Sequence, residues 1–361
     1  MSFSSIYFYQ FRNLQNATVP VPSEQVFFIG ENGQGKSNFL EAIYFLCYGS
    51  SFRTRKDEHL VLHDTQEMAV SGTWNDDRGS STLSIKIEKG KKTITLNGEV
   101  MKDRSQLVDM IPCVVFSHED IEFVKGPPEV QRWFFNQTSS MVDPTFLDHL
   151  RRYTRILKTR NQILKDGRVD LLPVYDHQLV VHGLPLQAAR EGLVDSFNKV
   201  FADIFSYVSD LPLPLEIRYI PSWGDNPQEL DVLSLLEKKR DYDSFLKTST
   251  RGPHRDKFTF FYGDQDFSTL GSTGQFRLVS LVLRAAQARL LADYRRKKPV
   301  LLIDDVLLEL DDGRRKKFLQ CLPEFSQAFY TFLPDEHVRE YISGKRITYR
   351  VKNGAFYEES L

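Results

Sequence analysis

The chain of 361 residues has few of the features that mark secreted, membrane-embedded or metal-stabilised proteins. Its three cysteines, Cys47, Cys113 and Cys321, are far apart and form no C-x-x-C pair, which argues against a disulfide framework and a zinc site. No apolar run approaches the ~18–20 residues that span a bilayer, and the N-terminus lacks the pattern of a secretion signal. We therefore expect buried thiols, a cytoplasmic location and no membrane partner.

An excess of charge of one sign is also missing. Lys and Arg number 47 against 48 Asp and Glu, for a formal net charge of -1. A whole-protein basic field of the kind that attracts nucleic acid is therefore excluded, and any nucleic-acid surface must be local. Internal repeats and low-complexity tracts are absent as well. The length allows two or three lobes of about 150 residues each.

A phosphate-binding loop stands near the start of the sequence. The apolar run 25–29 predicts a buried strand, and the spacing of apolar residues over 36–48 predicts a helix. The G-x-x-x-x-G-K-S pattern between them presents backbone N–H groups to a polyphosphate, with Lys36 on the β- and γ-phosphates and Ser37 on Mg²⁺. The alternative is a glycine-rich turn that only connects the strand to the helix, but it would not explain the presence of Lys36. The predicted ATP contacts in this segment are Gly30, Glu31, Asn32, Gly33, Gln34, Gly35, Lys36, Ser37 and Asn38.

A second half of the same site is predicted near the other end. The apolar run 300–303 is typical of a buried parallel strand, and Asp304 and Asp305 follow it. Asp304 at the strand tip can hold Mg²⁺, while Asp305 can orient or deprotonate the attacking water. With Lys36 these two aspartates are the predicted catalytic residues. The alternative is that the paired carboxylates cap a turn or the next helix.

The segment 272–275 opens a predicted helix that runs to about residue 294. It resembles the signature segment of ABC-type ATPases, in which a serine hydroxyl and a glycine N–H bind the γ-phosphate held by a partner subunit. This resemblance implies nucleotide contacts across a dimer by Ser272, Gly274 and Gln275. The structural alternative is that Ser272 is only a helix N-cap. The later segment 309–311 resembles the D-loop of the same ATPases.

The two halves of the site are about 270 positions apart in the chain. Residues 67–100 alternate in polarity between turn signals, which predicts antiparallel hairpins. Residues 126–247 form long helical segments broken at Gly167, at 183–185 and at 211–214, and strand character returns at 258–262. The predicted fold is α/β: an ABC/SMC-like ATPase head with mixed parallel and antiparallel sheets plus an inserted, mainly helical lobe. Residues 1–125 and 249–361 would form the two parts of the head, and 126–248 the lobe.

Several further segments together closely resemble the RecF family of bacterial recombination mediators, which is related to the SMC ATPases. They are 11–13, 38–43, 49–53, 116–120, 252–256 and 304–306. The resemblance covers essentially the whole chain. It implies binding of ATP and Mg²⁺, with Arg12 touching the nucleotide, and a head-to-tail dimer formed on ATP. It also implies binding of double-stranded DNA and single-strand/double-strand junctions, slow DNA-dependent hydrolysis, and recombinase loading with RecR and RecO.

Some assignments stay open at this stage. The DNA contacts that we favour are Arg53, Arg55, Lys56, Arg151, Arg155 and Lys158, although each basic cluster is also compatible with a solvated surface. His254 is expected to order a turn, since no metal-ligand partner stands near it. No switch histidine is evident at 331–334. The alternative functions are a nucleotide-binding subunit of an ABC transporter and a structural protein that binds nucleotide without hydrolysing it.

Overall fold

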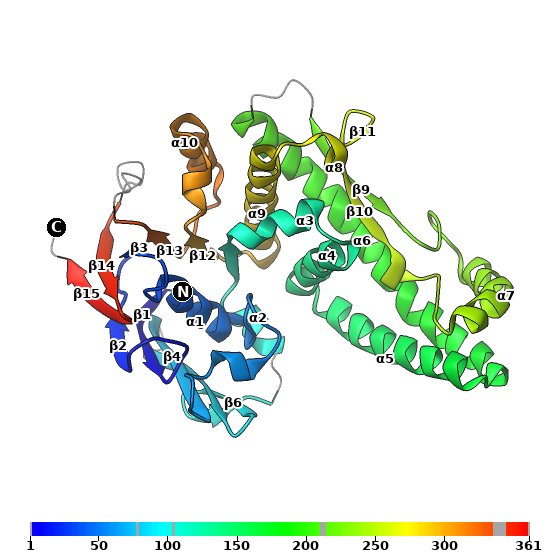
Figure 1. Cartoon of the computed structure of the whole chain (residues 1–361), viewed down its shortest axis with the longest axis horizontal. Helices are drawn as coiled ribbons and strands as arrows, with labels where there is room; N and C mark the ends of the chain where they lie inside the picture. The colour runs from blue at the N-terminus through cyan, green and yellow to red at the C-terminus, as the bar shows by residue number, and fades with distance from the viewer. Residues whose placement is uncertain (1, 77–78, 103–104, 210–213, 335–343, 360–361) are drawn as a thin grey trace. The chain divides into compact units, whose positions relative to one another are not determined.

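The computed structural model describes residues 2–76, 79–102, 105–209, 214–334 and 344–359 (Figure 1). The chain divides into two compact units. The first unit comprises Met1–Asp120 and Leu283–Leu361, and the second comprises Ile121–Val282. Both ends of the sequence therefore contribute to the first unit.

The second unit ends 34 residues later than the inserted lobe that the sequence predicted. Residues 249–282, which we expected in the head, belong to the second unit because strand β10 (Lys257–Tyr262) pairs antiparallel with β9 (Leu215–Ile220). The helix α9 (Thr273–Arg295) begins in the second unit and ends in the first. The predicted signature segment 272–275 thus stands in the second unit.

A mostly parallel sheet forms the centre of the first unit. Its strand order is β15-β14-β3-β13-β12-β8, and only β15 runs antiparallel to its neighbour. Every residue of β3, β8, β12 and β13 is buried, and for β3 and β12 the apolar runs predicted this. The strands are β3 (Gln25–Ile29), β8 (Cys113–Phe116), β12 (Val300–Asp304), β13 (Gln327–Phe332), β14 (Arg346–Lys352) and β15 (Ala355–Glu359).

A second, antiparallel sheet of the same unit has the order β2-β1-β4-β5-β6-β7. Its strands are β1 (Phe3–Tyr9), β2 (Ala17–Pro20), β4 (Glu67–Asp76), β5 (Gly79–Glu88), β6 (Lys91–Leu96) and β7 (Glu99–Val100). The hairpins predicted over 67–100 are therefore confirmed. Short helices complete the unit: η1 (Asp57–Leu60), α2 (Ser105–Met110), η5 (Val306–Glu309) and α10 (Asp312–Cys321). The turn η2 (His118–Ile121) spans the boundary between the units.

Helix α1 (Lys36–Tyr48) packs against strands of both sheets (Figure 1). Every residue from Phe39 to Tyr48 is buried. The Phe39 ring lies 4.2 Å from that of Phe28 on β3 and 5.0 Å from that of Phe8 on β1, between centroids. Burial of each such ring contributes about 1.5–3 kcal/mol. The helix is thereby fixed in place, and so is the phosphate loop that leads into it.

The second unit is mainly helical. Its helices are α3 (Glu122–Lys125), α4 (Pro128–Val142), α5 (Pro144–Asp166), η3 (Val169–Leu171), α6 (Leu172–Val208), α7 (Glu229–Leu246), η4 (Pro253–Arg255) and α8 (Phe267–Leu270). Figure 1 shows α5, α6 and α7 side by side, around a core that includes Tyr153, Leu179 and Trp223. Strands β9, β10 and β11 (Gln265–Asp266) form a small sheet.

One predicted helix break is wrong. We expected 183–185 to interrupt the helix, but α6 continues through Pro185. The close packing of Gly183 favours this, because a Cβ there would approach Trp223 Cη2 to 2.2 Å, and such tertiary contacts override local propensity. The break predicted at Gly167 is confirmed, since this residue caps α5 with a φ of 71°. Of the break predicted at 211–214, residues 211–213 lie outside the described residues.

The segment 252–256 is tied into the second unit by buried polar contacts. Asp256 accepts hydrogen bonds from Arg190 Nη1 at 2.6 Å and from the Ser222 backbone N–H at 2.8 Å. His254 Nε2 lies 3.0 Å from the Ser249 carbonyl oxygen, so this nitrogen donates, and Nδ1 accepts from the Tyr153 hydroxyl at 2.7 Å. Burial lowers the pKa of His254 to about 4. These contacts support the turn-ordering role that we expected for His254.

We expect His254 to make the stability of the chain depend on pH. Because its pKa is about 4 when folded and about 6.5 when unfolded, only the unfolded state takes up the proton between these values. The free energy of unfolding should therefore fall by up to about 3 kcal/mol as the pH falls from 6.5 to 4, and stay level above 6.5.

Urea unfolding of wild type and His254→Gln at pH 5 and pH 7.5 measures this contribution. The variant should lose less stability than the wild type on acidification. His63→Gln is the matched control, because the His63 side chain is 91% exposed. Equal losses in wild type and His254→Gln would contradict the prediction.

Candidate nucleotide-binding site

The loop 30–37 joins β3 to α1 within the first unit. Gly33 and Gly35 have φ values of 77° and 112°, a conformation that favours glycine. Gly35 is the N-cap of α1 and supplies no side chain to the first-turn N–H groups of the helix. These groups are therefore left to an anionic ligand.

Lys36 points into the loop rather than into solvent. Its side chain is only 4% exposed, and Nζ donates to the Gly30 carbonyl at 2.6 Å and to the Glu31 carbonyl at 3.2 Å. Nζ also lies 3.8 Å from Asp305 Oδ2. A buried ammonium needs anionic or carbonyl partners. The lysine is thus already held among oxygen atoms at the place where a phosphate group would enter.

The structure brings the two distant halves of the sequence together. Ser37 Oγ donates to Asp304 Oδ1 at 2.8 Å, across 267 positions of the chain. Thr331, which is paired with Asp304 across β12 and β13, donates to the same oxygen at 2.9 Å and accepts from the Asp305 N–H at 2.9 Å. Burial raises the pKa of Asp304, and the hydrogen bond from Ser37 opposes that shift.

The donor set fits a magnesium–nucleotide complex better than a metal held by protein alone. Ser37 Oγ and Asp304 Oδ1 are hard oxygen ligands beside the phosphate loop. Asp305 Oδ1 is buried without a hydrogen-bond partner in the described part of the chain. Among those residues no group of three or more His, Cys, Asp or Glu could hold a metal ion. One or two protein oxygens completed by phosphates and water is the usual arrangement for Mg²⁺.

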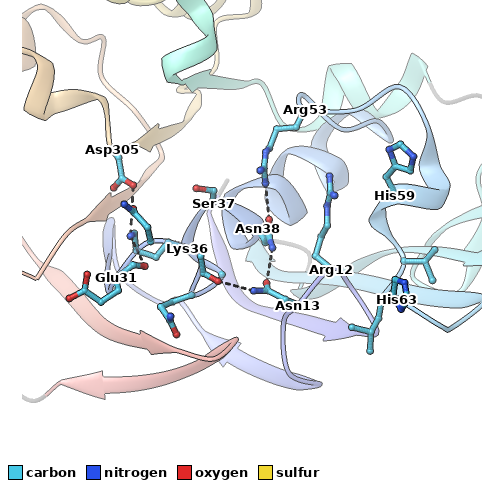
Figure 2. Close-up of a pocket in the computed structure, with 16 residues that line it drawn as sticks. Arg12, Asn13, Glu31, Lys36, Ser37, Asn38, Arg53, His59, His63 and Asp305 are labelled. Atoms are coloured by element: carbon cyan, nitrogen blue, oxygen red, sulfur yellow. Dashed lines mark hydrogen bonds and ion pairs between the residues drawn. The ribbon is translucent and has the colours of Figure 1, made fainter.

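A pocket of about 560 Å³ opens over these residues. Figure 2 shows Asp305 and Lys36 toward one end of it and His59 and His63 toward the other. The histidine end was not predicted from the sequence. The segment 57–63 reaches the pocket through long-range backbone contacts, namely Arg12 N–H to the Leu60 carbonyl at 2.8 Å and the bridge between Phe11 and Val61. No local sequence pattern signals such contacts.

Comparison with known proteins identifies the family. A family model described as the RecF/RecN/SMC N terminal domain matches residues 2–354. The DNA replication and repair protein RecF of Treponema pallidum is 41% identical over 352 residues, which cover 96% of this chain and 99% of the relative. The chain belongs to the RecF family. The protein of the same name from Clostridium novyi is 34% identical, with 95% and 96% of the two chains covered.

Solved structures agree with this assignment. The recombination mediator protein RecF with ATPrS in the RecFOR pathway matches with a TM-score of 0.89 and 28% identity, over 99% of this chain and 98% of that one. An Smc head bound to a domain of ScpA matches with a TM-score of 0.56 and 16% identity, over 99% and 97% of the chains, which shows likeness of fold alone. The resemblance to the RecF family and the predicted ABC/SMC-like fold class are thereby confirmed.

No helix in the described ranges is long and apolar enough to span a membrane.

Two arginines of the family motifs line the pocket. Arg12, which the family resemblance implies on the nucleotide, lines the pocket, and its guanidinium pairs with Glu41. Arg53, which we favoured for DNA contact, lines the pocket and donates to Asn38 Oδ1 at 2.8 Å (Figure 2). Its side chain is also 38% exposed, so the DNA contact stays a prediction. It lies five residues after the end of α1, and its bond to Asn38 directs the side chain toward the nucleotide loop. Arg53 is therefore a pocket residue in this structure.

The other basic residues that we favoured for DNA are exposed. Arg55 and Lys56 lie in the first unit, where Lys56 Nζ is 3.5 Å from Glu58. Arg151, Arg155 and Lys158 lie on α5 in the second unit.

The predicted signature segment forms a reciprocal helix cap. Ser272 Oγ accepts from the Gln275 N–H at 3.3 Å, and Gln275 Oε1 accepts from the Ser272 N–H at 2.8 Å. Within a single chain, Ser272 thus acts as the helix N-cap that the structural alternative described. Ser272 and Gly274 are both exposed, and a Cβ at Gly274 would meet nothing within 4 Å. The surface that they form in the second unit is open to a ligand.

The segment resembling a D-loop also has a partner that the sequence did not indicate. His118 Nδ1, just beyond β8, contacts the carboxylate of Glu309 at the end of η5. This hydrogen bond raises the pKa of His118. Asp311, two residues later, caps α10 by accepting from the Arg314 N–H at 2.9 Å.

We predict that Thr331 holds both aspartates in place. Thr331→Val keeps the shape of the side chain but removes the donor to Asp304 and leaves the Asp305 N–H without its acceptor. Such a loss should lower the free energy of unfolding by about 1–3 kcal/mol. Thr331→Ser, which keeps the hydroxyl, should be affected less. Urea unfolding of the three proteins measures the effect, and equal stability of Thr331→Val and wild type would refute it.

Proposed function

We propose that this chain is an ATP-driven switch of DNA repair that binds ATP and Mg²⁺ in the pocket of the first unit. The observation that carries this proposal is the 2.8 Å hydrogen bond between Ser37 and Asp304. It joins the phosphate loop to the tip of β12, at the carboxyl end of a parallel sheet where ligands bind in such folds. Membership of the RecF family supports the nucleotide as ATP, because solved relatives are described with ATP and ATPrS.

Different side chains of the pocket have different roles in the proposed reaction. Lys36 exchanges its contacts with the Gly30 and Glu31 carbonyls for the terminal phosphates. Ser37 and Asp304 would hold Mg²⁺, which when bound neutralises phosphate charge. Asp305 accepts the proton of the attacking water or orients that water, and its unpartnered Oδ1 is suited to this. Asp305 has a shorter side chain than glutamate, which fits slow hydrolysis of ATP.

The second half of the nucleotide site is proposed to come from another copy of the chain. Ser272 and Gly274 stand exposed at the start of α9. Ser272 Oγ caps the Gln275 N–H, and the N–H groups of Thr273 and Gly274 precede the first i−4 carbonyl of the helix. Such groups bind anions. Offered to the nucleotide of a second copy, with Gln275 beside them, they would make a head-to-tail dimer that forms on ATP and separates after hydrolysis.

DNA and protein partners follow from the family. Relatives are described as DNA replication and repair proteins and as a mediator in the RecFOR pathway. We infer that this chain binds double-stranded DNA and single-strand/double-strand junctions, and that with RecR and RecO it promotes recombinase loading. The proposed contacts with the DNA backbone are Arg55, Lys56, Arg151, Arg155 and Lys158, all of which are exposed. The relatives favour this function over that of a transporter subunit.

The first test addresses hydrolysis. Asp305→Asn should lower DNA-stimulated ATP turnover by about 10²–10⁴-fold while ATP binding persists, because a general base contributes that much. Turnover is measured with duplex, gapped and single-stranded DNA. Asp64→Asn, at a side chain 87% exposed, is the control. Turnover that is absent in the wild type would instead support a purely structural nucleotide, and full turnover in Asp305→Asn would exclude Asp305 as the base.

The second test addresses dimerisation. The substitution Asp305→Asn slows hydrolysis, so gel filtration of this variant with ATP should show a dimer. Adding Ser272→Arg should return the protein to a monomer, because the side chain would fill the space of the partner's phosphates. Ser268→Arg, also exposed and in the same unit, should leave the dimer intact. A monomer under all conditions at high protein concentration would overturn the dimer mechanism.

A further inference from the structure

A completely buried carboxylate lies behind the wall of the pocket. Glu41 stands on α1 one helical turn after Ser37, and its side chain is 0% exposed. It accepts from Arg12 Nε at 3.0 Å and from Arg12 Nη2 at 2.9 Å. Arg53 Nη1 lies 3.6 Å from its Oε2. Arg12 and Arg53 line the pocket, whereas Glu41 is not among the lining residues, so it acts on the pocket only through them.

The backbone around both arginines also depends on this carboxylate. Arg12 has a φ of 51°, an uncommon conformation for a residue other than glycine, and its side chain is held by the two-pronged contact with Glu41. The Ser51 hydroxyl donates to Glu41 Oε1 and accepts from the N–H groups of Arg53 and Thr54 at 2.9 and 3.0 Å. Glu41 thereby anchors the turn that carries Arg53.

A chain of hydrogen bonds leads from Arg53 back to the phosphate loop (Figure 2). Arg53 Nη1 donates to Asn38 Oδ1 at 2.8 Å, and Asn38 Nδ2 donates to Asn13 Oδ1 at 2.7 Å. Asn13 Nδ2 then donates to the Gly33 carbonyl at 3.1 Å. The position of Arg53 is therefore coupled to the loop that would receive the phosphates.

We infer that Glu41 is a positioning residue for nucleotide binding, which fixes Arg12 and Arg53 on one wall of the pocket to receive the phosphate groups of ATP. This inference rests on the proposed function. The charges fit the role, since two guanidinium groups and one carboxylate leave a net positive charge toward the pocket. A carboxylate placed inside the pocket would repel a polyphosphate, whereas one buried behind the arginines orients them.

The first experiment measures ATP affinity. Glu41→Gln removes the charge with little change in shape, and we expect the Kd for ATP to rise about tenfold or more, as misplaced binding groups cost this much. Glu41→Asp, which keeps the charge, should recover part of the affinity. Asp120→Asn is the matched control, because Asp120 is equally buried in the same unit and pairs with Arg284 at 2.7 Å but does not hold a pocket residue. Equal weakening in Asp120→Asn would indicate a merely structural role.

A double-variant background separates positioning from general packing. In the Arg12→Ala/Arg53→Ala protein, Glu41→Gln should cause no further loss of ATP affinity, because the groups through which Glu41 acts are gone. An added loss as large as in the wild type would refute the inference. The melting temperature, measured alongside, should rise on Glu41→Gln in that background, because an unpaired buried charge is removed.

A second readout needs no nucleotide and keeps this inference separate from the proposed function. Phenylglyoxal modifies free guanidinium groups, and mass spectrometry of the peptides reports the rate at each arginine. Arg12 and Arg53 should react several-fold faster in Glu41→Gln than in wild type, and at unchanged rates in Asp120→Asn. Unchanged rates in Glu41→Gln would overturn the positioning role. Failure of the wild type to bind ATP would overturn the proposed function and the nucleotide role of Glu41, but not its positioning of the two arginines.

Discussion

The burial of α1 between two sheets is the constraint on which the site depends. The helix has apolar contacts with strands of the parallel sheet on one side and of the antiparallel sheet on the other. Its first residues are therefore held against the carboxyl ends of β3 and β12. Lys36, Ser37, Asn38 and Glu41 all belong to this one helix. A single packed element therefore places the loop lysine, the proposed magnesium ligand and the carboxylate that contacts two arginines. A buried helix cannot shift without opening the core.

Parallel register completes the site by bringing remote sequence together. Asp304, Thr331 and Phe28 lie in register on β12, β13 and β3, so these three strands end at the same edge. One hydroxyl, that of Thr331, then bridges the backbone of Asp305 and the carboxylate of Asp304. The two aspartates to which we assign the metal and the attacking water in the proposed function are thus positioned by the same side chain. A shift of one residue between β12 and β13 would misplace both.

The parts that the sequence predicted well are those with strong local patterns. Continuous apolar runs predicted β3 and β12, and the spacing of the glycines and Lys36 predicted the loop before α1. The failures all arise from long-range contacts. Gly183 packs on Trp223 within a continuous helix, and β10 pairs with β9 and so extends the second unit beyond residue 248. The place of Arg53 in the pocket lining could not be predicted either, because it follows from side-chain contacts with Asn38 and Glu41.

Local charge explains how a chain of net charge -1 can offer a site for a polyanion. Lys36 is buried among carbonyl oxygens, and Arg12 and Arg53 are neutralised only in part by one carboxylate that the pocket does not expose. At the opposite end, Asp305 lies 3.8 Å from Lys36. Entry of a phosphate would draw the lysine away from Asp305 and leave that carboxylate without its cation. In the proposed reaction, the ion pair that holds Lys36 before binding would keep Asp305 engaged until the nucleotide is in place.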